Sequence, residues 1–195
     1  MTSVGIPRST DVVVVGGGAT GSAAAWWLAR RGVGVVLLER VGPGYRPGTP
    51  RGRVDPALVA EGRRLWAELG QEAGQQMDPG TAVTVLQDAA AAHGAVIGHH
   101  RRVTAVLPDG DGVRARQAAG ADVHARVAVV TAGDRTPALL GPGFLLPDRV
   151  SPVVLRRVVV GPAGGCGLVG APAVGRVLAD LALGQPGIPV PALTA

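Results

Sequence analysis

The chain has 195 residues, a length that suits one domain with a buried core, and a formal net charge of +5. All 19 basic residues are arginines, scattered as singles and pairs, and only 3% of residues are aromatic. This pattern argues against a surface that binds nucleic acid. The single cysteine excludes an internal disulfide and favours a cytoplasmic location.

Residues 12–29 form an uncharged run, which a membrane span or a signal peptide would also show. Three consecutive glycines interrupt the run, however, and a buried parallel strand followed by a buried helix explains it better. We therefore expect no membrane segment.

The most informative stretch is residues 11–40, which read DVVVVGGGATGSAAAWWLARRGVGVVLLER. This order predicts a strand, a glycine turn, a helix and a second strand that ends in an acid. Gly16 is expected to permit the tight turn, Gly18 to let a diphosphate approach the backbone, and Gly21 to let the helix pack on the strand. The helix N-terminus would hold the phosphates, and Glu39 would accept hydrogen bonds from a ribose.

Two helices are predicted next, each starting at an Asp-Pro pair. The pairs are Asp55-Pro56 and Asp78-Pro79, and the second helix should end at Gly94. Trp66 lies on the apolar face of the first of these helices, so it is predicted to be a core residue, as are Trp26 and Trp27. The Pro/Gly-rich loop 41–53 before them is either a solvated connector or a cover over a bound dinucleotide.

From Ala95 the hydrophobic period changes to two. Residues 102–108, 113–118 and 121–130 are predicted to form an antiparallel meander, and the apolar end of its last strand should enter the parallel sheet. The chain then reaches Thr131-Ala132-Gly133. Residues 161–184 predict a glycine-rich loop and a helix with Pro172 near its start and Gly184 at its end.

No metal site or catalytic residue can be assigned from the pattern. His99 and His100 are adjacent and would point to opposite faces of a strand, and no cluster of metal ligands surrounds them. Cys166 is either a reactive thiol or an inert small residue; no lysine exists in the chain and no histidine is adjacent to it to lower its pKa.

Three separated segments resemble the D-amino-acid-oxidase-like flavoproteins, especially the sarcosine and N-methyl-amino-acid oxidase branch. They are the stretch 11–40, then LQDAAAAHGAVIGHHRRVTAVLPDGDGVRARQAAG with ARVAVVTAG, and finally GGCGLVGAPAVGRVLADLALG. The resemblance implies an α/β fold, an FAD/NAD(P)-binding Rossmann-like domain with a parallel sheet, helices and an antiparallel meander.

The resemblance also implies non-covalently bound FAD and a division of the chain. Residues 1–160 would be the N-terminal part of the FAD-binding domain, with 141–160 a remnant of the substrate domain, and 161–195 would supply the flavin loop and last helix. The implied cofactor-binding residues are Gly16, Gly18, Ala19, Thr20, Gly21, Glu39, Arg40, Thr49, Val103, Ala132, Gly133, Gly165, Cys166, Gly167 and Leu168.

The departures from the family pattern concern the catalytic half. Family members are longer, and most of the substrate domain is missing between Val160 and Gly161. The lysine implicated in oxygen activation has no counterpart, because the chain contains no lysine. Catalytic residues are therefore not carried over.

Three functions stay open at this point. The first is an FAD-dependent oxidase that takes hydride from a small-molecule amine or amino acid and is reoxidised by O2. The second is an inactive remnant that binds a dinucleotide, with self-association through an uncovered apolar face. The third is an NAD-dependent Rossmann protein.

Overall fold

The computed structural model describes residues 5–42, 56–70, 78–141, 144, 152–162 and 167–186. Their strands form one eight-stranded sheet whose central order is β3-β2-β1-β6-β5-β4, with β8 also paired to β6 and β7 to β8. The strands are β1 (Ser9–Val15), β2 (Val35–Leu38), β3 (Val96–Gly98), β4 (Val103–Asp109), β5 (Gly112–Gln117), β6 (Val123–Val130), β7 (Val153–Leu155) and β8 (Val158–Val160).

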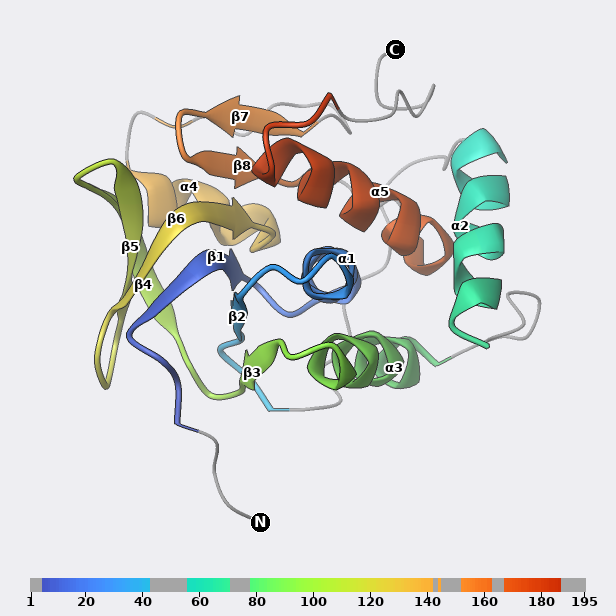
Figure 1. The fold of residues 1–195 in the computed structure, drawn as a ribbon, viewed down its shortest axis with the longest axis horizontal. Coiled ribbons are helices and arrows are strands. Elements are labelled where there is room, and N and C mark those ends of the chain that lie inside the picture. The colour runs from blue at the N-terminus through green and yellow to red at the C-terminus, as the bar shows by residue number, and fades with distance from the viewer. Residues whose placement is uncertain are drawn as a thin grey trace.

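The centre of the sheet is parallel and its outer parts are antiparallel. β1 lies between β2 and β6 and is parallel to both. One edge of β6 is divided: residues 123–125 pair antiparallel with β5, and residues 128–130 pair parallel with β8. The meander therefore leaves the parallel sheet at the point where β8 joins it, as Figure 1 shows.

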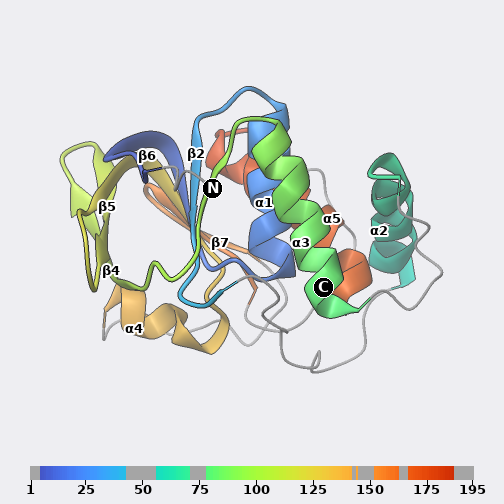
Figure 2. The ribbon, with the colours of Figure 1, turned by 90° about the horizontal axis from the view of Figure 1, so that it is seen from below.

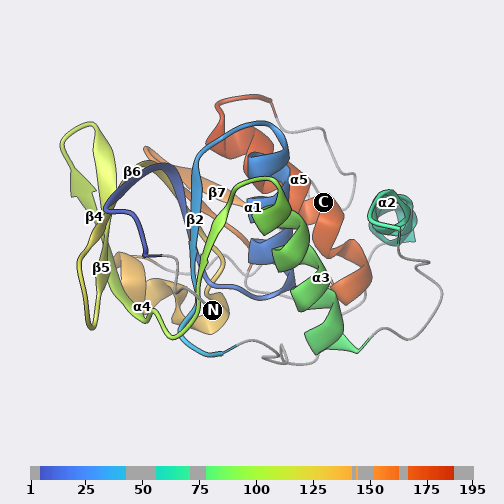
Figure 3. The ribbon, with the colours of Figure 1, turned by 60° about the horizontal axis from the view of Figure 1, so that its bottom comes forward.

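Helices cover one face of this sheet. They are α1 (Ala19–Arg30), α3 (Pro79–Ala92) and α5 (Gly167–Ala182), with α2 (Pro56–Glu68) outside them against α5. Figure 2 shows α1, α3 and α5 on one side of the strands, and β4, β5 and the short helix α4 (Thr136–Leu140) on the other. Figure 3 shows the same layers after a smaller rotation, with α2 beyond α5. The molecule is thus built in layers around β1.

Two hydrophobic clusters follow from the alternation of side chains along β1. Val12 and Val14 pack with the helices, whereas Val13 and Val15 pack with the meander and α4. Both faces of β1 are buried, which explains why its sequence is a continuous run of valines rather than an alternating one. The predicted fold class is confirmed.

The predicted meander and the helix starts at Pro56 and Pro79 are also confirmed, whereas Asp55 itself lies outside the described residues. The side chain of Asp78 caps α3 by accepting hydrogen bonds from the N–H groups of Gly80 and Thr81, and the helix is followed by Gly94 at φ +93°. Trp26, Trp27 and Trp66 are buried in the core. The three-residue strands β3, β7 and β8 were not predicted; they are too short to show a period.

A proline explains how α5 is joined to α2. α5 starts at Gly167, and Pro172 lies in its second turn. Pro172 has no N–H to donate to the carbonyl of Leu168, four residues earlier. The indole Nε1 of Trp66 donates to this carbonyl instead, at 3.3 Å. A proline inside a helix thus opens a hydrogen-bonding position that a neighbouring helix fills.

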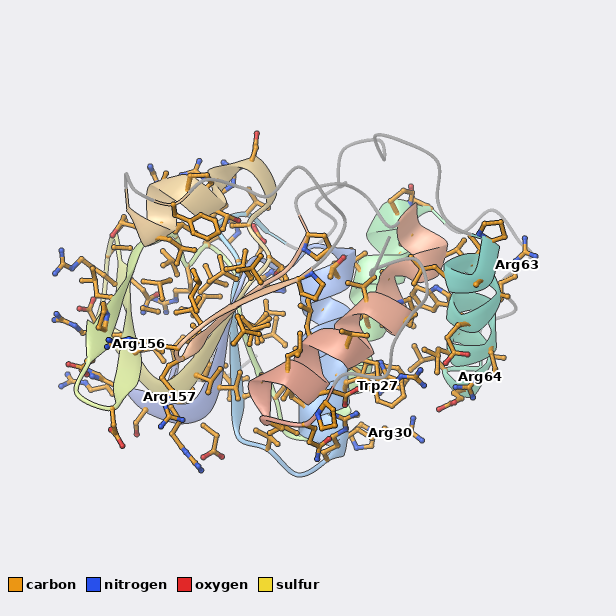
Figure 4. All side chains as sticks on the ribbon, turned by 90° about the horizontal axis from the view of Figure 1, so that it is seen from above. Trp27, Arg30, Arg63, Arg64, Arg156 and Arg157 are labelled. Carbon is orange, nitrogen blue, oxygen red and sulfur yellow. The ribbon has the colours of Figure 1, made fainter. Side chains whose placement is uncertain are left out.

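Charged side chains also join α2 to α5 and α1 near the surface. Arg64 binds Glu61 and Glu68 along α2, and Arg176 of α5 binds Glu61 at 2.8 Å. The hydrogen bond from Arg64 lowers the pKa of Glu61. Arg30 lies over the ring of Trp27 and binds Glu68 of α2. In Figure 4, Trp27 and Arg30 lie near the end of α2 at which Arg64 is labelled. The side chains of Arg30 and Arg64 are exposed to solvent, so their ion pairs contribute little, whereas the Arg176–Glu61 pair is more buried.

Every strand that the structure describes belongs to the one sheet, so a second sheet of a substrate domain is not present among the described residues. None of the described helices is both long and apolar enough to cross a membrane. The predicted loop 41–53 lies almost entirely outside the described residues, which end at residue 42 and resume at 56.

The contact between α2 and α5 gives a test of the packing. A Cβ on Gly62 would overlap the carbonyl oxygen of Val169 and lie 2.8 Å from its carbonyl carbon. Gly→Ala in a helix normally stabilises by up to about 1 kcal/mol, but overpacking costs about 1–3 kcal/mol. Gly62→Ala should therefore lower the melting temperature, measured by circular dichroism.

Ala60→Val, at an exposed position of the same helix, is the control and should change the melting temperature little. A Gly62→Ala variant that is more stable than the wild type would contradict the close approach of α2 and α5.

Candidate functional site

The ends of the parallel strands bring the predicted site residues together. Val15 of β1 pairs with Leu38 of β2 on one side and with Val130 of β6 on the other. The residues that follow these three are Gly16, Glu39 and Thr131, so they lie side by side at the carboxyl edge of the sheet. Ligands of open α/β sheets bind at this edge, outside the carboxyl ends of the strands.

Gly16 and Gly21 are glycines because there is no room for a side chain. Gly16 has φ +108°, and a Cβ there would lie 2.6 Å from the carbonyl oxygen of Thr131. A Cβ on Gly21 would overlap the carbonyl oxygen of Gly16 and the Oγ1 of Thr131. Thr131 itself donates a hydrogen bond from Oγ1 to the carbonyl of Gly16, at 2.9 Å. The turn, the first helix and the end of β6 are therefore in direct contact.

Gly18 is a glycine for a different reason. Its backbone is extended, with φ −68°, and a Cβ there would meet no atom within 4 Å. It precedes α1 and has no side chain to cap the helix. A helix N-terminus beside open space, with no capping side chain, is an anion-binding geometry. The residues present therefore fit a diphosphate at this position.

Glu39 is buried at the end of β2 and has well-defined partners. Its carboxylate accepts a hydrogen bond from the N–H of Gly17 at 2.6 Å and another from the N–H of Val41 at 3.0 Å. Each carboxylate oxygen has a second lone pair, so capacity to accept ribose hydroxyls remains. Its backbone N–H donates to the carbonyl of Gly98 at 2.8 Å, which joins this position to the end of β3.

The other predicted residues lie at varied distances from the turn. Ala19 and Thr20 begin α1, Arg40 is exposed after Glu39, and Ala132 lies against Gly16. Three further segments carry the remaining predicted residues. Gly133 opens a 3-10 turn, Val103 is buried at the start of β4 in the meander, and Gly167 and Leu168 begin α5. Thr49, Gly165 and Cys166 lie outside the described residues. Their roles toward a cofactor stay predictions.

Sequence reasoning missed three polar residues at the turn: Thr131, Ser22 and Gln87. Ser22 Oγ donates to the carbonyl of Gly17 at 3.1 Å, and Gln87 of α3 approaches the same carbonyl. One signal was available for Gln87. It lies four residues after Val83 on the apolar face of α3, where a polar side chain needs a buried partner.

The described residues contain no group of three or more His, Cys, Asp or Glu side chains that could hold a metal ion. His99 and His100 follow β3 and do not form such a cluster.

The comparison with protein families found one match that includes the glycine turn. Residues 11–75, a third of the chain, match the model of the DAO family, described as FAD dependent oxidoreductase. The matched stretch contains the glycine turn, α1 and Glu39. The family description names FAD, so FAD is the cofactor that the match implies for this turn. No curated protein matches the chain in sequence at a significant level.

Solved structures share the fold over nearly the whole chain. NikD, an unusual amino acid oxidase essential for nikkomycin biosynthesis, has a TM-score of 0.73 at 18% identity, covering 96% of this chain and 97% of that chain. L-proline dehydrogenase from P. horikoshii gives 0.76 at 13% identity, covering 95% and 96%. Glycine oxidase from Bacillus cereus gives 0.71 at 13% identity, covering 95% and 98%. At these identities the likeness shows the fold.

The two kinds of glycine can be separated by the same substitution at both. Gly18→Val should abolish FAD binding, because the side chain fills the space that the diphosphate needs, and should change the free energy of unfolding by only about 0.5 kcal/mol. Gly21→Val should lower the free energy of unfolding by about 3 kcal/mol, the upper end of the usual cost of overpacking, because its side chain overlaps the turn. Chemical denaturation and flavin titration measure the two effects. A Gly18→Val protein that binds FAD normally would place the site elsewhere.

Glu39→Ala should weaken FAD binding by about 1–3 kcal/mol, the usual cost of losing a charged hydrogen-bond acceptor. It also leaves two backbone N–H groups without their partner, so stability should fall as well. FMN lacks the adenosine ribose, so its affinity separates the loss of the ribose contact from the loss of stability. If FAD and FMN affinities fall equally, Glu39 does not bind the ribose.

Proposed function

We propose that this protein is an FAD-dependent oxidoreductase that acts on a small amine or amino acid, similar to the N-methyl-amino-acid oxidases. The observation that carries the proposal is the family match over residues 11–75, together with a glycine turn in which only the diphosphate-facing position, Gly18, is open. Fold neighbours that are an amino acid oxidase, a glycine oxidase and a proline dehydrogenase support this class of substrate.

The chain's own residues would bind the dinucleotide in two places. The N–H groups at the start of α1 and the backbone of Gly18 hold the diphosphate, where the helix dipole favours negative charge. The carboxylate of Glu39 accepts hydrogen bonds from the ribose hydroxyls. Burial of Glu39 and its two backbone donors fixes the direction of the carboxylate before the ligand arrives.

The reactive end of the cofactor would lie toward the start of α5. The glycine loop at 164–168 and the dipole of the helix behind it would stabilise negative charge at the N1–C2=O edge of the reduced flavin. When bound, FAD supplies the redox chemistry, accepting hydride from the substrate Cα and delivering the electrons to O2. Binding is proposed to be non-covalent, and no residue of the chain is assigned to catalysis.

A second candidate is a dinucleotide-binding module without turnover. Two observations favour it: the described strands all belong to one sheet, and the chain contains no lysine to assist oxygen activation. Such a module would expose apolar surface, and Val154 and Leu155 are the exposed large hydrophobic residues of the described part. Self-association and a cytoplasmic location stay predictions, as does the alternative that NAD takes the place of FAD.

The absorbance spectrum of the purified protein tests these candidates. After incubation with excess FAD and removal of free ligand, the protein should retain a yellow flavin spectrum. Anaerobic addition of N-methyl amino acids, glycine or proline should then bleach the spectrum if the protein is an oxidoreductase. Bound flavin that no amine reduces would favour the binding module, whereas a colourless protein that binds NAD would contradict the FAD proposal.

A further inference from the structure

Gln87 is a buried polar side chain whose amide is directed at the glycine turn. It lies on the inner face of α3, is 6% exposed, and is surrounded on its own helix by Val83, Leu86 and Ala90. Its Nε2 lies 3.2 Å from the carbonyl oxygen of Gly17 and 3.2 Å from the Oγ of Ser22. Because a carbonyl oxygen only accepts hydrogen bonds, the atom facing it must be the amide nitrogen rather than the amide oxygen.

The three groups form a closed set of hydrogen bonds. Ser22 donates its hydroxyl hydrogen to the carbonyl of Gly17 at 3.1 Å, and its oxygen accepts from Gln87. The carbonyl of Gly17 accepts from both side chains, which uses both of its lone pairs. An isolated buried amide would be costly, so these partners explain why α3 carries a glutamine at this position.

This arrangement fixes the direction of the next N–H group. Among the described residues there are no cis peptide bonds, so the Gly17–Gly18 peptide is trans and its N–H is antiparallel to its carbonyl. Since Gln87 and Ser22 hold the carbonyl of Gly17 toward the core, the N–H of Gly18 points away from them. A Cβ at Gly18 would meet no atom within 4 Å, so there is space beside this residue for a ligand.

Such support from outside the turn is needed because of the sequence of the turn itself. Residues 16–18 are three consecutive glycines, which have wide conformational freedom and can rotate a peptide plane at little steric cost. The N–H of Gly17 is already fixed by Glu39. The Gly17–Gly18 peptide is the next one along, and its carbonyl is held from α1 and α3.

We propose that Gln87 and Ser22 are positioning residues that orient the N–H of Gly18 toward the diphosphate of the bound dinucleotide. This inference rests on the proposed function, because it assumes that a dinucleotide binds at the turn. It adds α3 to the site: the helix acts through the turn without touching the ligand. The hydrogen bonds of Gln87 and Ser22 should therefore affect the affinity for the diphosphate and not the affinity for the adenosine.

Comparison of ADP with adenosine isolates the diphosphate. Gln87→Met keeps the length of the side chain but removes the donor, and Ser22→Ala is a smaller second change. Each variant should weaken ADP binding about five- to tenfold, which corresponds to the loss of one hydrogen bond between the N–H of Gly18 and the diphosphate. Each should change adenosine binding by no more than about twofold. Titrations followed by amide NMR measure both ligands, and ADP should move the Gly18 amide signal less in the variants than in the wild type.

Val83→Ala is the control, because it removes buried volume from the same face of α3 without touching the turn. It should lower the melting temperature and leave the ratio of ADP to adenosine affinity unchanged. If both variants at the turn bind ADP as the wild type does, or lose ADP and adenosine affinity equally, Gln87 and Ser22 have a structural role only. If the wild type binds neither FAD nor ADP, the proposed function itself fails, and this inference fails with it.

Discussion

The structure depends on a contact that leaves no space: the place where the glycine turn, the start of α1 and the end of β6 meet. Gly16, Gly21 and Thr131 touch so closely that a single Cβ at either glycine would overlap backbone or the threonine side chain. This contact sets how near α1 lies to the parallel sheet, and thereby where its N-terminus opens. The open helix N-terminus, at which we propose that the diphosphate binds, is a consequence of this packing.

The remaining elements hold this turn and α1 in place. Glu39, directly after β2, binds the N–H of Gly17, and Gln87 of α3 binds the carbonyl of Gly17. α5 packs on α1, where Gly175 allows close approach to Ala23, and α2 is attached to α5 through Trp66. The core of the helical layer is therefore arranged around one turn of three glycines, and only Gly18 is left with open space beside it.

The sequence predicted the parts whose signal is local. Glycine spacing, the valine run and the terminal acid predicted β1, α1 and β2, because Gly16 and Gly21 are each required by a close contact at the turn. The alternation in residues 113–130 predicted the meander and its entry into the sheet. β3, β7 and β8 were not predicted, because strands of three residues are fixed by their neighbours rather than by a pattern of their own. Gln87 and Thr131 were missed since their partners lie 70 and 115 residues away in the chain.

The central claim is that FAD binds with its diphosphate beside Gly18 and its ribose on Glu39. A crystal structure of the protein with FAD tests this most directly. Phosphate oxygens should lie within hydrogen-bonding distance of the N–H groups at the start of α1, and ribose hydroxyls should donate hydrogen bonds to the carboxylate of Glu39. A dinucleotide bound at another edge of the sheet, or one whose diphosphate does not reach Gly18, would contradict it.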